Sequence, residues 1–101
     1  MAFKIIWSKS AQRQFDNIVS YIESEWSNRI SFKFVVKANE LFELLKLYPE
    51  AGSIEIKEKN IRGFLLTKQV KIFYRLKSSE IILLSFFDTR LNPKKKLKKY
   101  K

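Results

Sequence analysis

The chain has 101 residues, enough for one domain, and its 46% hydrophobic and 15% aromatic content can supply a hydrophobic core. It contains no cysteine and no histidine, which excludes disulfides and thiolate chemistry and removes the commonest metal ligand and general base. We therefore expect no metal and no cofactor. The sequence shows no signal peptide and no apolar run long enough for a membrane span, so we expect a cytoplasmic protein without a membrane partner.

The formal net charge of +11 is distributed unevenly along the chain. Residues 1–56 contain seven basic and seven acidic side chains, whereas residues 57–101 contain 14 basic and three acidic ones. A one-sided positive field favours a polyanionic partner, either nucleic acid or an acidic protein. The alternative is that the charge serves only solubility and belongs to a solvated lysine tail.

The N-terminal half predicts a strand followed by two helices. Phe3–Trp7 is a short apolar run, and Ser8 or Ser10 can cap the helix that follows. Apolar residues recur at helical spacing from Lys9 to Glu25 and again from Arg29 to Leu47. The short break at Ser27-Asn28 makes the two helices an antiparallel hairpin, and either residue can cap the second one.

The second helix is expected to end at Pro49-Glu50-Ala51-Gly52, because proline cannot continue a helix and glycine permits a turn. Ser53–Lys59 then alternates strictly, which predicts a half-exposed strand or arm. One face of that strand would carry Ile54 and Ile56, and the other would carry Glu55, Lys57 and Lys59.

The rest of the chain predicts further strands. Residues 60–63 form a bend, Phe64–Thr67 is a strand, and Lys68-Gln69 is a tight turn. A β-hairpin follows, with strands at Val70–Leu76 and Ile81–Phe87 joined by a polar turn at residues 77–80.

This order of elements predicts an α+β fold, in which an N-terminal strand and an antiparallel two-helix hairpin accompany a mainly antiparallel sheet of four or five strands. The helices would cover one face of the sheet and leave a surface rich in lysine and arginine turned outward. Residues 1–93 form the single domain, and residues 94–101, which include six lysines, form a flexible basic tail. Trp7 and Trp26 are both expected in the core.

Several short signatures occur in the same order in the RelE/ParE superfamily, which the chain resembles over Phe3–Pro93. The Pro-x-x-Gly turn and the long helical hairpin resemble the ParE branch more than the RelE branch. The signatures are Ser10-Ala11, Ile18-Val19-Ser20-Tyr21-Ile22, Pro49-Glu50-Ala51-Gly52, Arg62 with Phe64, Ile72-Phe73-Tyr74-Arg75, and Ile82-Leu83-Leu84 followed by Asp88-Thr89-Arg90.

The resemblance implies the toxin of a bacterial type II toxin–antitoxin system, which serves plasmid stabilization and inhibits growth unless an acidic antitoxin binds it. ParE-like members act on DNA gyrase, and the ParE-like branch is favoured here. RelE-like members cut mRNA on the ribosome without a metal, which is the alternative. A third possibility is a basic interaction module that is not toxic.

The residues leave open whether the chain is an enzyme; if it is one, a metal-independent endoribonuclease is expected. Arg90 matches the arginine with which nuclease members leave the last strand, but Asp88 stands where many members have histidine. The arginine of the middle strand would fall near Leu66-Thr67, and the C-terminal tyrosine has only Tyr100 as a candidate. RNA cleavage requires proton transfers, which would then depend on residues other than these. The remaining candidates are Glu55, Glu58, and Lys57 or Lys59 with a lowered pKa, arranged with Arg90 around the scissile phosphate.

Each other candidate has a functional and a structural interpretation. Arg62 matches a basic position of ParE-like members, or it pairs with Asp88 or Glu50 to hold the strands together. Arg75 is a phosphate contact or a solvated edge residue, and Asp88 anchors Arg90 or caps the following turn. Target or nucleic-acid binding is assigned to the basic residues Lys57, Lys59, Arg75, Lys94, Lys95 and Lys96.

Overall fold

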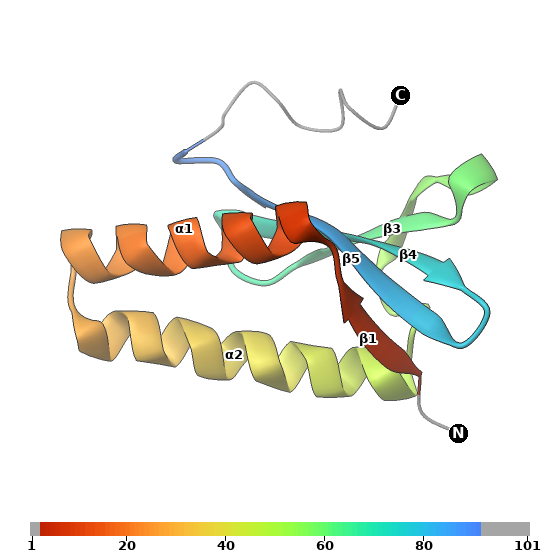
Figure 1. Cartoon of the computed structure of the whole chain (residues 1–101), viewed down its shortest axis with the longest axis horizontal. Helices are drawn as coiled ribbons and strands as arrows, with labels where there is room; N and C mark the ends of the chain where they lie inside the picture. Colours follow the sequence, from red (N-terminus) through yellow and green to blue (C-terminus); the bar gives the residue numbers. More distant parts are fainter. Residues whose placement is uncertain (1–2, 92–101) are drawn as a thin grey trace.

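The computed structural model describes residues 3–91 and shows two long helices beside a five-stranded sheet (Figure 1). Strand order in the sheet is β1-β5-β4-β3-β2, with β1 parallel to β5 and every other neighbouring pair antiparallel. The predicted α+β class, helical hairpin and mainly antiparallel sheet are confirmed. The elements are β1 (Lys4–Trp7), α1 (Lys9–Glu25), α2 (Asn28–Leu47), β2 (Ser53–Ile56), a 3-10 helix (Lys57–Lys59), β3 (Ile61–Leu65), β4 (Val70–Lys77) and β5 (Glu80–Asp88).

Serine side chains begin both helices. The Ser8 hydroxyl accepts a hydrogen bond from the Ala11 N–H at 3.0 Å, and the Ser27 hydroxyl accepts one from the Ile30 N–H at 3.2 Å. Each cap satisfies an N–H group that has no partner within the first helical turn. As a result α1 has the predicted bounds, and α2 begins one residue earlier than predicted.

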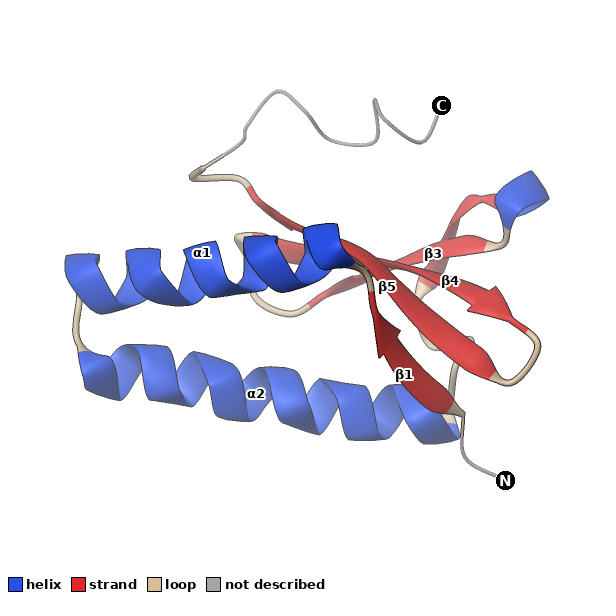
Figure 2. Cartoon of the chain, in the orientation of Figure 1, coloured by secondary structure: helices blue, strands red, loops and turns tan. Residues whose placement is uncertain are grey.

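Both helices pack on the same face of the sheet (Figure 2). Their buried residues form one core with the inward side chains of β4 and β5, such as Ile72 and Leu83. An aromatic cluster fills the centre, where Trp7 stacks on Phe86 with ring centroids 5.5 Å apart. Trp7 therefore packs against the core as predicted, whereas Trp26 is 55% exposed and its predicted burial is wrong.

The opposite face of the sheet is more apolar than expected. The strand register places Phe73 opposite Ser85 and Lys71 opposite Phe87, so these four side chains share the face that points away from the helices. Phe73 and Phe87 are both buried. Lys71 Nζ lies 5.3 Å from the centre of the Phe73 ring and 2.7 Å from a carboxylate oxygen of Glu55.

The edge strand β2 differs most from the sequence-based expectation. The register between β2 and β3 shifts between Ile54 and Ile56, so the alternation of side chains is interrupted. Ile54 is 57% exposed, while Glu55 pairs with Lys71 on the face that points away from the helices. The strand ends at Ile56, and Lys57–Lys59 forms a 3-10 helix instead of continuing the arm.

The other boundaries shift by a few residues. β3 begins at Ile61, where a bend was expected, and ends before a loop at residues 66–69. In that loop the Thr67 hydroxyl accepts hydrogen bonds from the N–H groups of Gln69 and Val70. The hairpin turn is shortened to Ser78-Ser79, with Ser78 at a positive φ of 56°.

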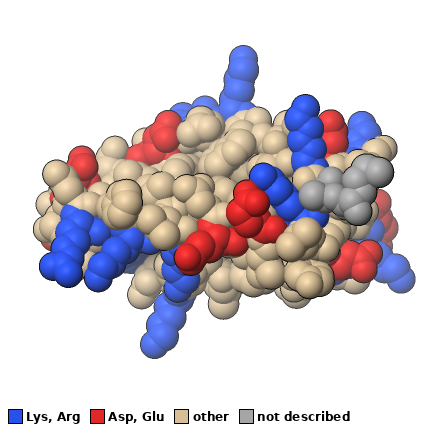
Figure 3. Space-filling view, turned by 90° about the horizontal axis from the view of Figure 1, so that it is seen from below, with Lys and Arg blue, Asp and Glu red and all other residues tan. Residues whose placement is uncertain are grey.

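Charges of both signs mark the surface on the α2 side (Figure 3). Lys and Arg side chains are interspersed there with Asp and Glu, between broad uncharged areas. Within residues 3–91, neither long helix is apolar enough to cross a membrane.

Candidate functional site

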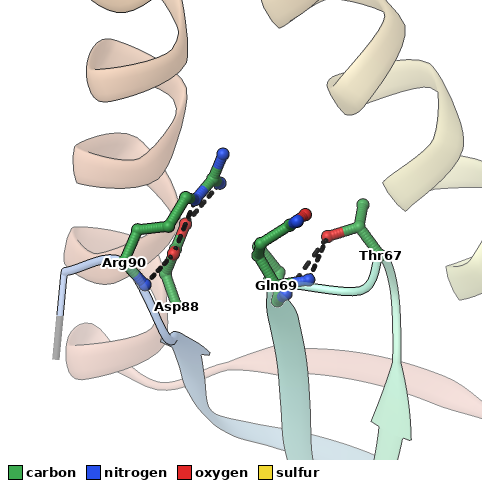
Figure 4. A network of polar contacts seen from close by, with 5 residues as sticks. Thr67, Gln69, Asp88 and Arg90 are labelled. Atoms are coloured by element: carbon green, nitrogen blue, oxygen red, sulfur yellow. Dashed lines mark hydrogen bonds and ion pairs between the residues drawn. The ribbon is translucent and has the colours of Figure 1, made fainter. Parts of the chain in front are cut away.

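Arg90 lies in the exit segment (residues 88–91), which leaves β5 beside the β3–β4 loop (Figure 4). The Thr89 N–H donates a hydrogen bond to the Gln69 carbonyl at 2.9 Å and joins the two segments. The side chains of Arg90 and Gln69 both extend toward the two helices. Arg90 therefore occupies a position set by β5, the loop and the helical hairpin together.

Asp88 holds the Arg90 guanidinium in a bidentate ion pair. Arg90 Nη2 lies 2.6 Å from Asp88 Oδ2, and Arg90 Nε lies 2.9 Å from Oδ1. The same Oδ1 also accepts the Arg90 backbone N–H at 2.8 Å, so Asp88 both anchors the side chain and caps the turn. The carboxylate is 1% exposed and the arginine side chain 26%. Charge-assisted pairs of this geometry are among the stronger hydrogen bonds in proteins.

The hydrogen bond to Asp88 is also the main reason that the pKa of Arg90 is raised above its ordinary value, although burial acts in the opposite direction. Two aromatic rings from the end of α1 add to this environment. The guanidinium carbon lies 5.1 Å from the Tyr21 ring centre and 5.5 Å from that of Trp26, within cation–π range. The exposed Trp26 thus contacts Arg90 at the tip of the hairpin instead of filling the core.

An open groove of about 270 Å³ adjoins this arginine. Its floor contains the buried apolar residues Ile22 and Phe34, and its rim carries the cationic side chains of Lys33, Lys37 and Arg90. Pockets for small molecules usually measure about 300–1,000 Å³ and enclose their ligand, so a small open groove is better suited to side chains of another macromolecule. The remaining lining residues are Trp26, Ile30, Thr67 and Gln69.

Several of the predicted basic residues are not brought together with Arg90. Val70 pairs with Asp88 at one end of the β4–β5 ladder, whereas Arg75 pairs with Ile82 and with Ile61 toward the other end. Arg75 is five positions after Val70 along β4, which corresponds to about 17 Å at 3.3 Å per residue. Arg75 is exposed there.

Lys57 and Lys59 lie in the 3-10 helix that precedes Ile61, beyond the same distant end of the sheet. The structure therefore does not bring them together with Arg90. Glu55 is also committed elsewhere, since its carboxylate pairs with Lys71 at 2.7 Å. Lys94, Lys95, Lys96 and Tyr100 lie outside the described residues.

Arg62 makes structural contacts, but with partners other than those expected. Its Nη1 donates to the backbone carbonyls of Glu50, at 3.2 Å, and Gly52, at 2.8 Å, instead of pairing with a carboxylate of Asp88 or Glu50. Tyr74 fastens the same connection, donating to the Pro49 carbonyl at 2.8 Å and accepting the Gly52 N–H at 2.9 Å. The helix-to-sheet connection after α2 is thus held by two side chains from the sheet.

Sequence reasoning named Arg90 and Asp88 as candidates but did not name most of the residues that line the groove. Lys33 and Lys37 are spaced i, i+4 on α2, a pattern that places them on one face of the helix. Their common spacing was the only available signal. The sequence contains no signal that Gln69 and Trp26 line the groove, because only the folded chain places the β3–β4 loop opposite the hairpin tip.

This helical hairpin on a mainly antiparallel sheet is shared with solved structures of bacterial toxins. A chain titled as the chromosomal ParDE toxin–antitoxin system from P. aeruginosa aligns with a TM-score of 0.71 at 17% identity, covering 86% of this chain and 96% of that one. A YoeB/ParE toxin from Agrobacterium tumefaciens aligns with a TM-score of 0.62 at 17% identity, covering 84% and 96%. A copper-bound L66S mutant toxin from Helicobacter pylori aligns with a TM-score of 0.59 at 21% identity, covering 88% and 97%.

The sequence itself identifies the family. Residues 5–93 match the sequence model described as the ParE toxin of type II toxin–antitoxin system, parDE. The chain belongs to this ParE toxin family, within the RelE/ParE superfamily, and its family pairs with antitoxins. Comparison with curated protein sequences finds no match.

Proposed function

We propose that the chain is a growth-inhibiting toxin that acts on DNA gyrase in the cytoplasm and is restrained by an acidic antitoxin. The observation that carries the proposal is the match to the ParE toxin family over residues 5–93. The groove beside Arg90 adds support, because its open apolar floor and cationic rim suit a protein surface.

The arrangement of charged residues favours a binding mechanism over RNA cleavage. Metal-free cleavage needs a general base and a general acid within hydrogen-bonding reach of the same phosphate. The candidates Lys57 and Lys59 lie at the end of the sheet remote from Arg90, and the Glu55 carboxylate is held by Lys71. A ribosome-dependent endonuclease would therefore have to build its acid and base from other groups.

Gyrase inhibition can be tested with purified components. Added in increasing amounts to gyrase, relaxed plasmid and ATP, the chain should reduce supercoiling, and an equimolar antitoxin should restore it. Unchanged supercoiling over the whole range would contradict the gyrase proposal. Codon-phased cuts in a translated message, detected by toeprinting, would replace it with the endonuclease alternative.

Arg90 is proposed as a target-contacting residue, which requires a variant that separates contact from folding. Replacing Arg90 alone would leave the buried Asp88 carboxylate without its counter-charge, so Asp88→Asn/Arg90→Ala should be compared with Asp88→Asn. Loss of growth arrest in the double variant but not in the single one would assign the contact to Arg90. The matched control is Arg75→Ala, since Arg75 is an exposed arginine at the distant end of the sheet.

The proposed antitoxin should be acidic, because the chain carries a net charge of +11 and opposite charge accelerates encounter. Its gene is expected next to the gene for this chain. Co-expression of that neighbour should restore growth, and its association rate should fall as salt is raised. Growth that is unaffected when the chain is expressed alone would instead favour the non-toxic interaction module.

A further inference from the structure

The side of α2 that faces solvent carries large apolar side chains. Phe32 is 68% exposed, Leu47 66% and Val36 39%. At about 100° per residue these three side chains fall within a sector of the helix about 60° wide. None of them lines the groove beside Arg90. We call the sector around these three residues the α2 outer face, and an exposed apolar strip of this kind marks an interaction surface.

Charged side chains on the α2 outer face are segregated by sign. Arg29 and Lys33 lie toward the N-terminal end of the helix, and Glu40 and Glu43 lie toward its C-terminal end. These four residues lie on or beside the apolar strip and widen the sector to about 100°. The face is therefore positive at one end and negative toward the other.

This distribution of charge does not stabilise the helix that carries it. Like charges at i, i+4, such as Arg29 and Lys33, oppose helix formation, and cations near the start of a helix oppose its dipole. The first turn of α2 contains no acidic residue.

The same charges are not used within the fold. In the part of the chain that the structure describes, Arg29, Lys33 and Glu40 form no ion pair. Glu43 pairs with Lys46 at 2.8 Å, but its side chain is 72% exposed, and pairs of this kind contribute little to stability. The four charges can therefore be matched by a partner.

A second copy of α2, lying antiparallel, supplies the matching charges. With a two-fold axis between positions 36 and 37, Lys33 and Glu40 lie equally far from the axis on opposite sides. Lys33 of each copy therefore faces Glu40 of the other, and Arg29 comes within one residue of Glu43 of the other. The two Val36 side chains meet at the axis, and the antiparallel helix dipoles attract each other.

The expected association is weak. Residues 29–44 of the two helices would overlap over about 22 Å, at 1.5 Å per residue. A single helix pair of this length lies at the low end of specific interface sizes, which start at about 1,200 Å². The copies also repel each other, because each carries a net charge of +11, but at 0.15 M salt exposed charges more than about 8 Å apart are largely screened.

We propose that two copies of the chain associate through their α2 outer faces as an antiparallel, two-fold symmetric dimer. Lys33 borders both the outer face and the groove beside Arg90, and the symmetry places this border on the same side of both copies. The dimer therefore presents its two grooves on one side. A target with two sites would bind it more tightly than it binds one copy, through effective concentration.

Sedimentation equilibrium of the full chain at 0.15 M salt provides the first test. We expect a monomer–dimer equilibrium with a dissociation constant of about 10–100 μM, as suits a small interface. A chain that remains monomeric up to about 1 mM would overturn the proposal. If such a chain also lost antitoxin or gyrase binding on Val36→Asp, the outer face would belong to that partner instead.

Exchanging the charges tests the antiparallel register. Lys33→Glu and Glu40→Lys should each weaken the dimer about tenfold or more, because each variant creates the same repulsive contact twice. An equimolar mixture of the two variants should dimerise again, since both contacts then join a glutamate to a lysine. A mixture that stays monomeric would contradict the register.

Matched variants separate the interface from general effects. Lys37→Glu makes the same charge change on the same helix, but Lys37 lies on the groove side, so dimerisation should change by less than about twofold. Val36→Asp should weaken the dimer about tenfold or more, whereas Ile54→Asp, at a 57% exposed position of β2, should not. Circular dichroism verifies folding. Equal effects within either pair would overturn the proposed interface.

A distance measurement checks the orientation. The chain has no cysteine, so Asn28→Cys provides a single site for a nitroxide label. In the antiparallel dimer the two labelled positions are separated by about 26 Å along the helices, at 1.5 Å per residue. Parallel packing would bring them to about the 8–10 Å between packed helix axes. A short distance in pulsed electron paramagnetic resonance would therefore refute the antiparallel dimer.

Discussion

Arg90 is part of the fold as well as a candidate for target binding. Its guanidinium is the counter-charge of a carboxylate that is 1% exposed, and it joins β5 to the two rings at the end of α1. A loss of activity on mutation could therefore arise from altered structure. This dual role determines how any Arg90 variant must be interpreted.

The first prediction concerns the stability of that ion pair. Arg90→Ala should lower the free energy of unfolding by about 3 kcal/mol, because removing one partner leaves a buried charge uncompensated. Asp88→Asn/Arg90→Ala should recover part of that loss, since asparagine is neutral and can still accept the backbone N–H of residue 90. Urea unfolding measures both. A single variant as stable as the parent chain would show that solvent already screens the pair.

The second prediction concerns the buried tyrosine of the helix-to-sheet connection. Tyr74→Phe should cost about 2 kcal/mol of unfolding free energy, because it leaves the Pro49 carbonyl and the Gly52 N–H without their partner. Burial raises the pKa of Tyr74 above its ordinary value, so the folded chain retains the phenolic proton more tightly than the unfolded chain.

That shift gives the second prediction a pH dependence. The stability contributed by the tyrosine is fully present below about pH 10, its unfolded pKa, and is lost as the pH rises through the higher folded value. The difference between Tyr74→Phe and the parent chain should therefore shrink above about pH 10. A difference that stays constant in alkaline denaturant titrations would contradict this account.

At this scale the sequence was informative where a side chain acts locally. Arg90 and Asp88 are two residues apart at a strand end, and their pairing was among the expected alternatives. The roles of Trp26 and Tyr74 depend on segments far away in the chain, since Trp26 meets Arg90 and Tyr74 meets Pro49. Hydrophobicity alone assigned Trp26 to the core, and no local pattern could correct that assignment.

The connection between α2 and β2 leaves little room for a larger side chain at Gly52. A Cβ atom at Gly52 would lie 2.6 Å from the Tyr74 hydroxyl oxygen and 2.7 Å from the Gly63 carbonyl oxygen. The carbonyl is part of the β3 backbone and cannot move without disturbing the sheet. Gly52 is therefore required by close packing, although its φ is not positive.

The third prediction follows from this packing. Gly52→Ala should lower the free energy of unfolding by about 1–3 kcal/mol, the usual cost of overpacking. Gly63→Ala is the matched control, because a Cβ there would meet the side-chain atoms Lys71 Cε and Glu55 Oε2, which can move more readily. Thermal unfolding should therefore show the larger loss for Gly52→Ala. The opposite order would mean that the Glu55–Lys71 pair is more rigid than the backbone of β3.

The sequence predicted the helices better than the edge of the sheet. Both helices have strong 3.6-residue periodicity and serine caps, so α1 was predicted with its observed bounds. The edge strand β2 has only four residues and a register shift, and neither feature is encoded in the alternation from Ser53 to Lys59. Because the alternation predicted a longer arm, it did not show that Lys57 and Lys59 lie in a 3-10 helix away from Arg90.

The net charge of the whole molecule is divided between residues 1–93 and the lysines of residues 94–101. Removal of residues 94–101 would take away six lysines and lower the formal net charge from +11 to +5. Residues 1–93 thus keep less than half of the total. Any sequence-independent affinity for polyanions should therefore depend strongly on the C-terminal lysines.

The fourth prediction tests this division. The chain without residues 94–101 should bind double-stranded DNA more weakly than the full chain, and its affinity should vary less steeply with salt concentration. Fluorescence anisotropy over a range of salt concentrations measures both. Equal salt slopes for the two chains would place the DNA contacts within residues 1–93.

The pairing of β1 with β5 has a consequence for synthesis. Lys4 lies opposite Glu80 in a parallel ladder, so β1 cannot join the sheet until β5 has been synthesised. A ribosome that stops before β5 releases a chain in which β1 has no strand to pair with, and contacts this distant in sequence form slowly. The nascent polypeptide therefore cannot complete its sheet until translation is nearly finished.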